Sequence, residues 1–263
     1  MKITGVSHIH SLYSYDAKLS LAELKKTFKE QGIQFALMTE HTDKLLQEEA
    51  KAFVKECQKL SDKDFVFVPG FEVPYRMSHV LMIGAKEFVA QHADEALLLQ
   101  WREKASFSVL AHPQLNHFIV DTTMKEVIDG VEVWNSQYDG KYVPRPQALK
   151  LLKELQGDKN IFAFAGLDFH RKEHLNGPQM TMEVEKLTES AILKNIQTGT
   201  YTLGKNTITI GSNGTISGNP FLLTWKSAIS IGFITLSKKI NKLLAAHDLS
   251  LPKRLKQYIR SKV

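Results

Sequence analysis

Short apolar runs alternate with helical segments along most of this 263-residue chain, and that alternation limits the folds available to it. The runs are rich in Val, Ile and Phe, as strands buried on both faces of a sheet are. They cover residues 33–38, 65–68, 107–110, 127–133 and 161–165. Because helices separate them, we predict parallel strands in a single α/β domain, either a barrel or a doubly wound sheet.

Boundary signals place the helices between these runs. Ser20 with Glu23 three residues later is typical of a helix start, and Gly32 of a helix end. The first predicted helix begins at Ser20 and ends at Gly32. The other predicted helices cover residues 44–60, 94–104, 147–155 and 189–197. Residues 201–203 and 207–210 are predicted to close the domain as a short hairpin.

Basic residues are concentrated at the C-terminal end. The chain has a net charge of +6, but residues 219–263 alone hold nine basic residues and one acid, which leaves −2 for residues 1–218. The junction at 211–220 is rich in turn formers and predicts a hairpin or linker. We therefore expect a main domain over 1–218 and a basic amphipathic helical extension over 219–263.

The extension has an apolar stripe at helical spacing, with Lys238, Lys239 and Lys242 on its flanks or opposite side. The stripe consists of Leu222, Trp225, Ile229, Phe233, Leu236, Ile240 and Leu243. Three interpretations remain open: a helix packed on the domain, an amphipathic helix on an anionic membrane surface, and an arm that binds nucleic acid.

The cysteine count and the apolar pattern exclude several classes of protein. Cys57 is the single cysteine, so an internal disulfide and a cysteine zinc site are excluded. The sequence has no apolar run of signal-peptide or membrane-spanning length. We predict a cytoplasmic protein, with peripheral attachment to a membrane as the alternative that the extension leaves open.

Metal-ligand residue types follow the ends of the apolar runs. The first strand ends in the pair His8 and His10, whose side chains point the same way from an extended backbone. The others are His41, Glu72, His112, Asp168 and His170, while Asp16 and His79 lie in neighbouring loops or strand starts. Because the ends of parallel strands share one face, these side chains are predicted to form one site there. Glu40 and Glu132 are interpreted as hydrogen-bonding groups behind the ligands.

In this order, the motifs resemble those of the PHP (polymerase and histidinol phosphatase) domain family of metal-dependent phosphoesterases. The resemblance covers roughly residues 1–210 and rests on the His8-x-His10 pair, Ser14-Tyr15-Asp16, Thr39-Glu40-His41, Gly70-Phe71-Glu72, His79, Ala111-His112-Pro113 and Gly166-Leu167-Asp168-Phe169-His170. It implies a distorted seven-stranded βα barrel of TIM-like type, with the catalytic domain over 1–218. One departure is Phe169, where many members carry a small residue such as Ser.

The resemblance also implies three divalent metal ions. The first would be held by His8, His10, Glu72 and Asp168, the second by Glu72, His79 and His112, and the third by Asp16, His41 and His170. Imidazole and carboxylate ligands without thiolate suit zinc, manganese or iron and argue against calcium. Their identity stays open among these three.

The predicted activity is hydrolysis of a phosphate monoester, on a small molecule or a nucleotide, by a metal-activated hydroxide. His170 and His41 are the candidate proton donors, and Arg76, Arg145 and Arg171 the candidate ligands for substrate phosphate. His174 is interpreted as a non-ligand. The alternatives are an exonuclease or oligonucleotide phosphoesterase, which would bind nucleic acid, and a catalytically silent, membrane-associated regulatory module.

Overall fold

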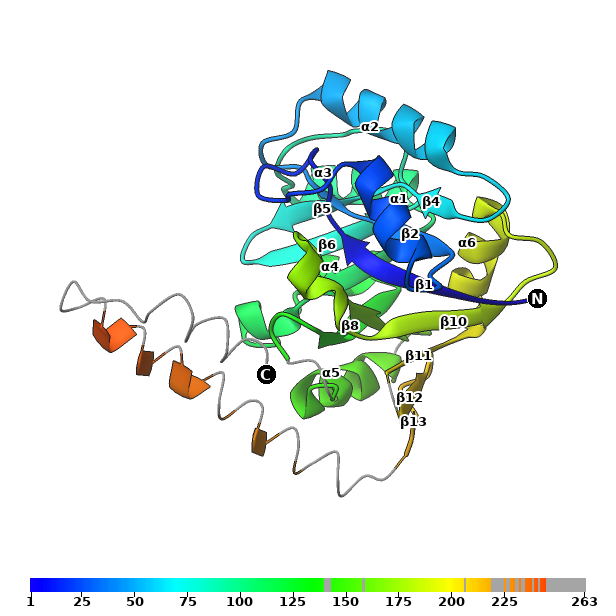
Figure 1. Cartoon of the computed structure of the whole chain (residues 1–263). Helices are drawn as coiled ribbons and strands as arrows, with labels where there is room; N and C mark the ends of the chain where they lie inside the picture. Colours follow the sequence, from blue (N-terminus) through cyan, green and yellow to red (C-terminus); the bar gives the residue numbers. More distant parts are fainter. Residues whose placement is uncertain are drawn as a thin grey trace.

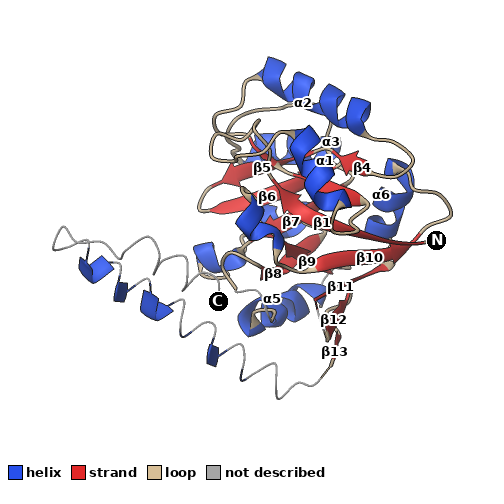
Figure 2. Cartoon of the chain, viewed as in Figure 1, coloured by secondary structure: helices blue, strands red, loops and turns tan. Residues whose placement is uncertain are grey.

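A computed structural model describes residues 1–139, 143–157, 159–205 and 207–218, together with single positions and short stretches between 225 and 244. Strands gather in the centre and helices lie around them, with α2 and α5 on opposite sides (Figure 1; Figure 2). The strands are β1 (Lys2–Ile9), β2 (Phe35–Met38), β3 (Glu40–His41), β4 (Val66–Val68), β5 (Gly70–Tyr75), β6 (Ser78–Ile83), β7 (Phe107–Ala111), β8 (Gly130–Asn135), β9 (Phe162–Gly166), β10 (Gln179–Glu183), β11 (Tyr201–Lys205), β12 (Ile208–Gly211) and β13 (Ile216–Ser217). The α-helices are α1 (Leu21–Lys29), α2 (Gln47–Leu60), α3 (Glu95–Lys104), α4 (Thr122–Val127), α5 (Pro146–Gln156) and α6 (Glu189–Gln197), with short 3-10 helices at η1 (Pro113–Asn116) and η2 (Lys172–Leu175).

The strands form two sheets of seven and six strands, in the orders β13-β12-β11-β10-β1-β2-β4 and β3-β5-β6-β7-β8-β9. Strands β1, β2 and β4 are parallel, as are β7, β8 and β9, which confirms the mixed α/β class. A closed seven-stranded barrel is not confirmed among the described residues. The two sheets meet at the end of β9, where Leu167 N donates to Ser7 O at 2.9 Å and Phe169 N to His8 O at 3.0 Å.

Strand β6 runs against both of its neighbours. It pairs antiparallel with β5 and with β7, and the pairing sets His79 opposite Ala111. The start of β6 therefore lies at the same edge as the ends of β5 and β7. This reversal places His79, a residue at the beginning of its strand, beside Glu72 and His112.

Local signals account for most helix boundaries. Ser20 and Glu23 form the predicted capping box at the start of α1, and the bounds of α6 match the predicted 189–197. Several elements were not predicted, α4 and β10 among them. Helix α4 occupies residues that were assigned in part to a strand, and β10 begins soon after the last ligand motif.

A continuous apolar core lies between the helices and the strands. Its largest fully buried side chains include Trp101, Trp134, Phe28 and Phe169, and Cys57 is buried there as a free thiol. Phe169 packs edge-on against Phe28, with ring centroids 5.4 Å apart. Phe169, where the sequence departs from the family pattern, thus fills space in the core.

Most of the predicted extension lies outside the described residues. At the junction, β13 pairs with β12, so a hairpin occupies part of 211–218. The described positions of the extension are helical, and Trp225, Ile229, Leu236, Ile240 and Leu243 are exposed among them. Across the described part of the chain, no helix has both the length and the apolar character to cross a membrane.

Candidate metal centre

Unusual backbone conformations set several of the predicted ligands. His8, His112 and Asp168 have φ values of 59°, 27° and 49°, in a region that side-chain-bearing residues rarely adopt. Each lies where a strand ends or is interrupted; at His8 the register between β1 and β2 shifts. Such strain persists where the surrounding structure enforces it, commonly at functional sites. Here it turns three side chains toward one point.

Glu72, on β5, lies at the centre of the group. Its Oε2 atom is 3.1 Å from His8 Nε2, 3.3 Å from His10 Nε2 and 3.3 Å from His41 Nδ1. Its Oε1 atom is 2.6 Å from His79 Nδ1 and 2.9 Å from His112 Nε2. Burial would raise the pKa of Glu72, but the surrounding imidazoles, His8 foremost, hold it well below the usual range. The carboxylate is therefore charged and faces five ring nitrogens.

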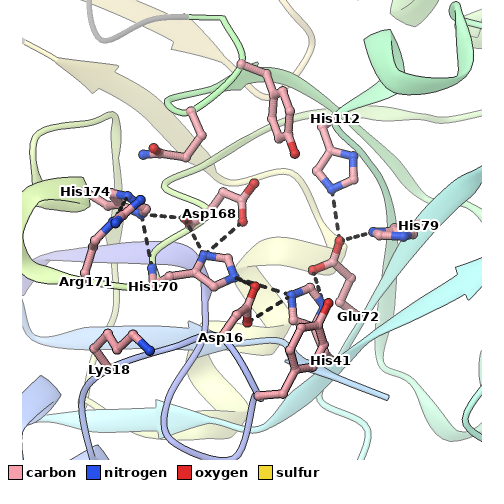
Figure 3. A pocket seen from close by; sticks show the side chains of 13 residues that line it. Asp16, Lys18, His41, Glu72, His79, His112, Asp168, His170, Arg171 and His174 are labelled. Carbon is pink, nitrogen blue, oxygen red and sulfur yellow. Dashed lines mark hydrogen bonds and ion pairs between the residues drawn. The ribbon is translucent and has the colours of Figure 1, made fainter. Parts of the chain in front are cut away.

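Asp168 and Asp16 complete the group on the side away from His79 and His112 (Figure 3). Asp168 Oδ1 lies 3.7 Å from both His8 Nε2 and His10 Nε2. Asp16 lies 3.3 Å from His170 Nε2 and 3.7 Å from His41 Nε2. All nine predicted ligands thus come together, although Asp16 and His79 are more exposed than the others.

Hydrogen bonds hold Nδ1 of both histidines in the first pair. Ser14 Oγ donates its hydrogen to Glu40 Oε2. The same oxygen lies 3.2 Å from His10 Nδ1 and therefore accepts a hydrogen bond from the N–H of that ring. His8 Nδ1 likewise faces Glu132 Oε1 at 2.9 Å. In both rings Nδ1 thus faces an oxygen behind the site, which leaves Nε2 as the atom that would bind a metal ion.

Glu40 and Glu132 support the ligands from behind. Glu40 is buried and accepts from Ser11 N, Ser11 Oγ and Ser14 Oγ, and burial raises its pKa to about 7 despite these donors. Glu132 Oε2 accepts from His112 N at 2.7 Å. A Cβ atom on Gly166 would lie 1.9 Å from Glu132 Oε1, so only glycine leaves room for this carboxylate.

The Glu132→Gln variant is expected to bind divalent metal about 10- to 100-fold more weakly, because the carboxylate that orients His8 and His112 N is lost. Competition with a chromogenic chelator measures the affinity. Glu126, an exposed acid on α4, gives the matched control Glu126→Gln, for which we expect unchanged affinity. Equal affinities for the two variants would contradict a supporting role for Glu132.

The donor set fits divalent metal ions. The buried atom His10 Nε2 makes no hydrogen bond, although Glu72 lies nearby. Two ligand atoms about 2.1 Å from a tetrahedral ion stand roughly 3.4 Å apart, close to the 3.3 Å between His10 Nε2 and Glu72 Oε2. Four overlapping groups of three potential ligands have all their donor atoms within 4.8 Å of one another. Imidazole and carboxylate donors of this kind suit divalent transition-metal ions.

A cavity of about 450 Å³ opens over these ligands. Its lining contains residues that the sequence motifs did not identify as functional: Tyr15, Lys18, Gln137, Tyr138 and His174. His174 was interpreted as a non-ligand, and its Nε2 accepts a hydrogen bond from Arg171 Nε at 2.9 Å. Burial, with Arg171 nearby, lowers the pKa of His174 to about 4, so the ring is neutral. The position of His174 a few residues after His170 was the signal in the sequence that could have placed it at the site.

The three predicted phosphate ligands occupy different environments. Arg76 is paired with Asp121 and Glu95 on an exposed turn, and Arg145 with the buried Asp139. Burial raises the pKa of Asp139 to about 6 despite Arg145, which also donates to Tyr138 O at 2.9 Å. Only Arg171 of the three lines the cavity.

Comparison with known proteins points to the same family as the sequence motifs. A family model described as the PHP domain matches residues 7–184. Among solved structures, a two-domain protein from Bacteroides vulgatus ATCC 8482, containing a predicted PHP-like metal-dependent phosphoesterase, aligns with a TM-score of 0.62 and 14% identity over 80% of this chain and 67% of its own.

Two further structures share the fold at low identity. PsfC from Pseudomonas syringae PB-5123 aligns with a TM-score of 0.53 and 12% identity over 89% of this chain and 99% of its own. PfuEndoQ, a novel lesion-specific endonuclease from Pyrococcus furiosus, aligns with a TM-score of 0.55 and 14% identity over 80% of this chain and 59% of its own. No curated protein sequence matches the chain.

Proposed function

The chain belongs to the PHP domain family of metal-dependent phosphoesterases, and from that premise we propose that it hydrolyses a phosphate monoester at a centre of three divalent metal ions. The observation that carries the proposal is the convergence of nine ligand-type side chains, Glu72 among them, seven of which line one cavity. A cavity of about 450 Å³ is in the range of small-molecule sites, which favours a phosphorylated small molecule or nucleotide.

His8, His10, Glu72 and Asp168 would hold the first ion, Glu72, His79 and His112 the second, and Asp16, His41 and His170 the third. Zn²⁺, Mn²⁺ or Fe²⁺ suits these donors. When bound, such ions lower the pKa of a coordinated water toward about 7 and neutralise charge on phosphoryl oxygens. The strained backbone at His8, His112 and Asp168 holds these ligands in place before substrate arrives.

Proton transfer to the leaving oxygen is assigned to His170 or His41. Their Nε2 atoms lie 3.3 Å apart beside Asp16, at the more open side of the cavity. Hydrogen bonding to Asp16 and the charges of Asp168 and Asp16 raise the pKa of His170 against the effect of burial, whereas burial lowers that of His41. Of the two imidazoles, His170 is thus the more basic.

The test is a substrate screen with the full chain reconstituted with Mn²⁺ or Zn²⁺. We expect release of phosphate from p-nitrophenyl phosphate or a nucleoside bisphosphate, and loss of that activity after chelation. Cleavage of oligonucleotides alone would support the nuclease alternative, to which the resemblance to PfuEndoQ gives some weight. A metal-loaded protein that hydrolyses none of these compounds would be better explained as a regulatory module.

A further inference from the structure

One edge of the cavity holds cationic side chains. Lys18, from the loop after β1, and Arg171, from the loop after β9, both line the cavity, on the side away from His79 and His112 (Figure 3). Lys18 N donates to His170 O at 2.9 Å, so the two loops are joined by their backbones. The remaining charged lining residues are the ligand carboxylates and imidazoles.

These two cations lack acidic partners. Arg76 and Arg145 are both committed to carboxylates, but neither Lys18 nor Arg171 forms an ion pair with any described residue. The Arg171 side chain donates a hydrogen bond to the ring of His174 at 2.9 Å. A guanidinium in a cavity mouth without a carboxylate partner is free to bind an anion.

His174 fixes the direction of Arg171. His174 Nε2 accepts from Arg171 Nε, and its Nδ1 atom lies 3.1 Å from Asp168 O and 3.2 Å from His170 N. The ring therefore connects Arg171 to the loop that carries Asp168 and His170. With Nε engaged, the two Nη groups remain available for a bidentate contact with two oxygens of one phosphate.

On the basis of the proposed function, we propose that Lys18 and Arg171 form an anion-binding edge that selects phosphate monoesters over diesters, with His174 as the positioning residue for Arg171. A monoester has three non-bridging oxygens and carries about −1.5 to −2 charges near pH 7, since its second pKa is about 6. A diester has two such oxygens and a single charge. An unpartnered lysine and arginine at the cavity edge favour the more highly charged group.

The test compares monoester and diester hydrolysis in the full, Mn²⁺-loaded protein. The Arg171→Gln variant is expected to lose about 30-fold in kcat/KM for p-nitrophenyl phosphate, the size of one charge-assisted contact, and no more than about 3-fold for bis(p-nitrophenyl) phosphate. Lys18→Gln, a change on a different loop, should also lower the ratio of kcat/KM for the monoester to kcat/KM for the diester. His174→Gln should raise KM for the monoester about 5-fold with kcat nearly unchanged, and Arg171→Lys should restore part of the loss.

Lys172→Gln is the matched control, because Lys172 neighbours Arg171 in sequence but does not line the cavity. Equal losses for monoester and diester in Arg171→Gln and Lys18→Gln would overturn the proposed selectivity, and an unchanged ratio in His174→Gln would overturn the positioning role. Titration with inorganic phosphate gives a readout independent of turnover. Weaker phosphate binding in Arg171→Gln supports the edge even if no ester is hydrolysed, and equal binding contradicts it.

Discussion

Replacing Glu72 with glutamine is expected to lower phosphatase activity by on the order of 10⁴-fold, the scale seen when an essential catalytic group is removed. The carboxylate faces five imidazoles through its two oxygens, and an amide supplies neither the charge nor the second acceptor. Since Glu72 belongs to the proposed first and second metal sites, we also expect loss of more than one ion. Steady-state kinetics and metal analysis of the same sample measure both effects.

The control is Glu154→Gln, which changes an exposed acid on α5 in the same way and should leave activity and metal content unchanged. Circular dichroism of Glu72→Gln separates a loss of metal from a loss of fold. A folded variant with more than a tenth of the wild-type activity would show that Glu72 is not a shared ligand.

Removal of the metal ions is expected to lower the melting temperature by roughly 10 °C. Ligand present at about 1,000 times its Kd stabilises a protein by about 4 kcal/mol, and each kcal/mol is worth about 2–4 °C in a domain of this size. The buried carboxylates of Glu72 and Asp168 lose their counter-charge when the ions leave. Calorimetry of metal-loaded and chelator-treated protein measures the shift.

Glu72→Gln provides the internal control for that measurement. If the ions bind at the site described, the chelator should change the melting temperature of this variant much less than that of the wild type. Identical melting temperatures for loaded and chelated wild-type protein would argue that no ion stabilises the folded state.

Most candidate ligands were visible in the sequence as ligand-type residues after apolar runs, and the family resemblance implied how they would divide among ions. Shared strand polarity brings Glu72, His112 and Asp168 to the same edge. His8 and His10 also face the site, but the positive φ of His8 and the register shift beside it replace the regular extended backbone that was predicted. The order of these residues is visible in the chain, and the structure brings them within contact distance.

Other features depended on contacts that sequence spacing does not encode. Helix α4 contains Val127, which belongs to an apolar run that also resembles a strand. The reversal of β6 follows from a tight hairpin with Arg76 at positive φ, and its turn lacks the glycine that commonly marks one. The two open sheets differ from the predicted barrel because β1 and β9 meet through a few backbone bonds instead of a regular ladder.

The cavity edge also lay beyond sequence reasoning. Arg76, Arg145 and Arg171 all adjoin ligand motifs, and only their partners distinguish them: carboxylates for the first two and His174 for the third. Lys18 reaches the cavity through a backbone bond between loops far apart in sequence. Long-range contacts of this kind decide which charge is available to a ligand.

Metal stoichiometry of the purified full chain tests the central claim most directly. The nine ligands predict three equivalents of divalent ion per chain after reconstitution with Mn²⁺ or Zn²⁺, measured by elemental analysis after gel filtration. The same measurement on His10→Ala and Asp168→Ala should show loss of at least the first ion. A folded wild-type protein that retains no divalent ion under these conditions would contradict the account.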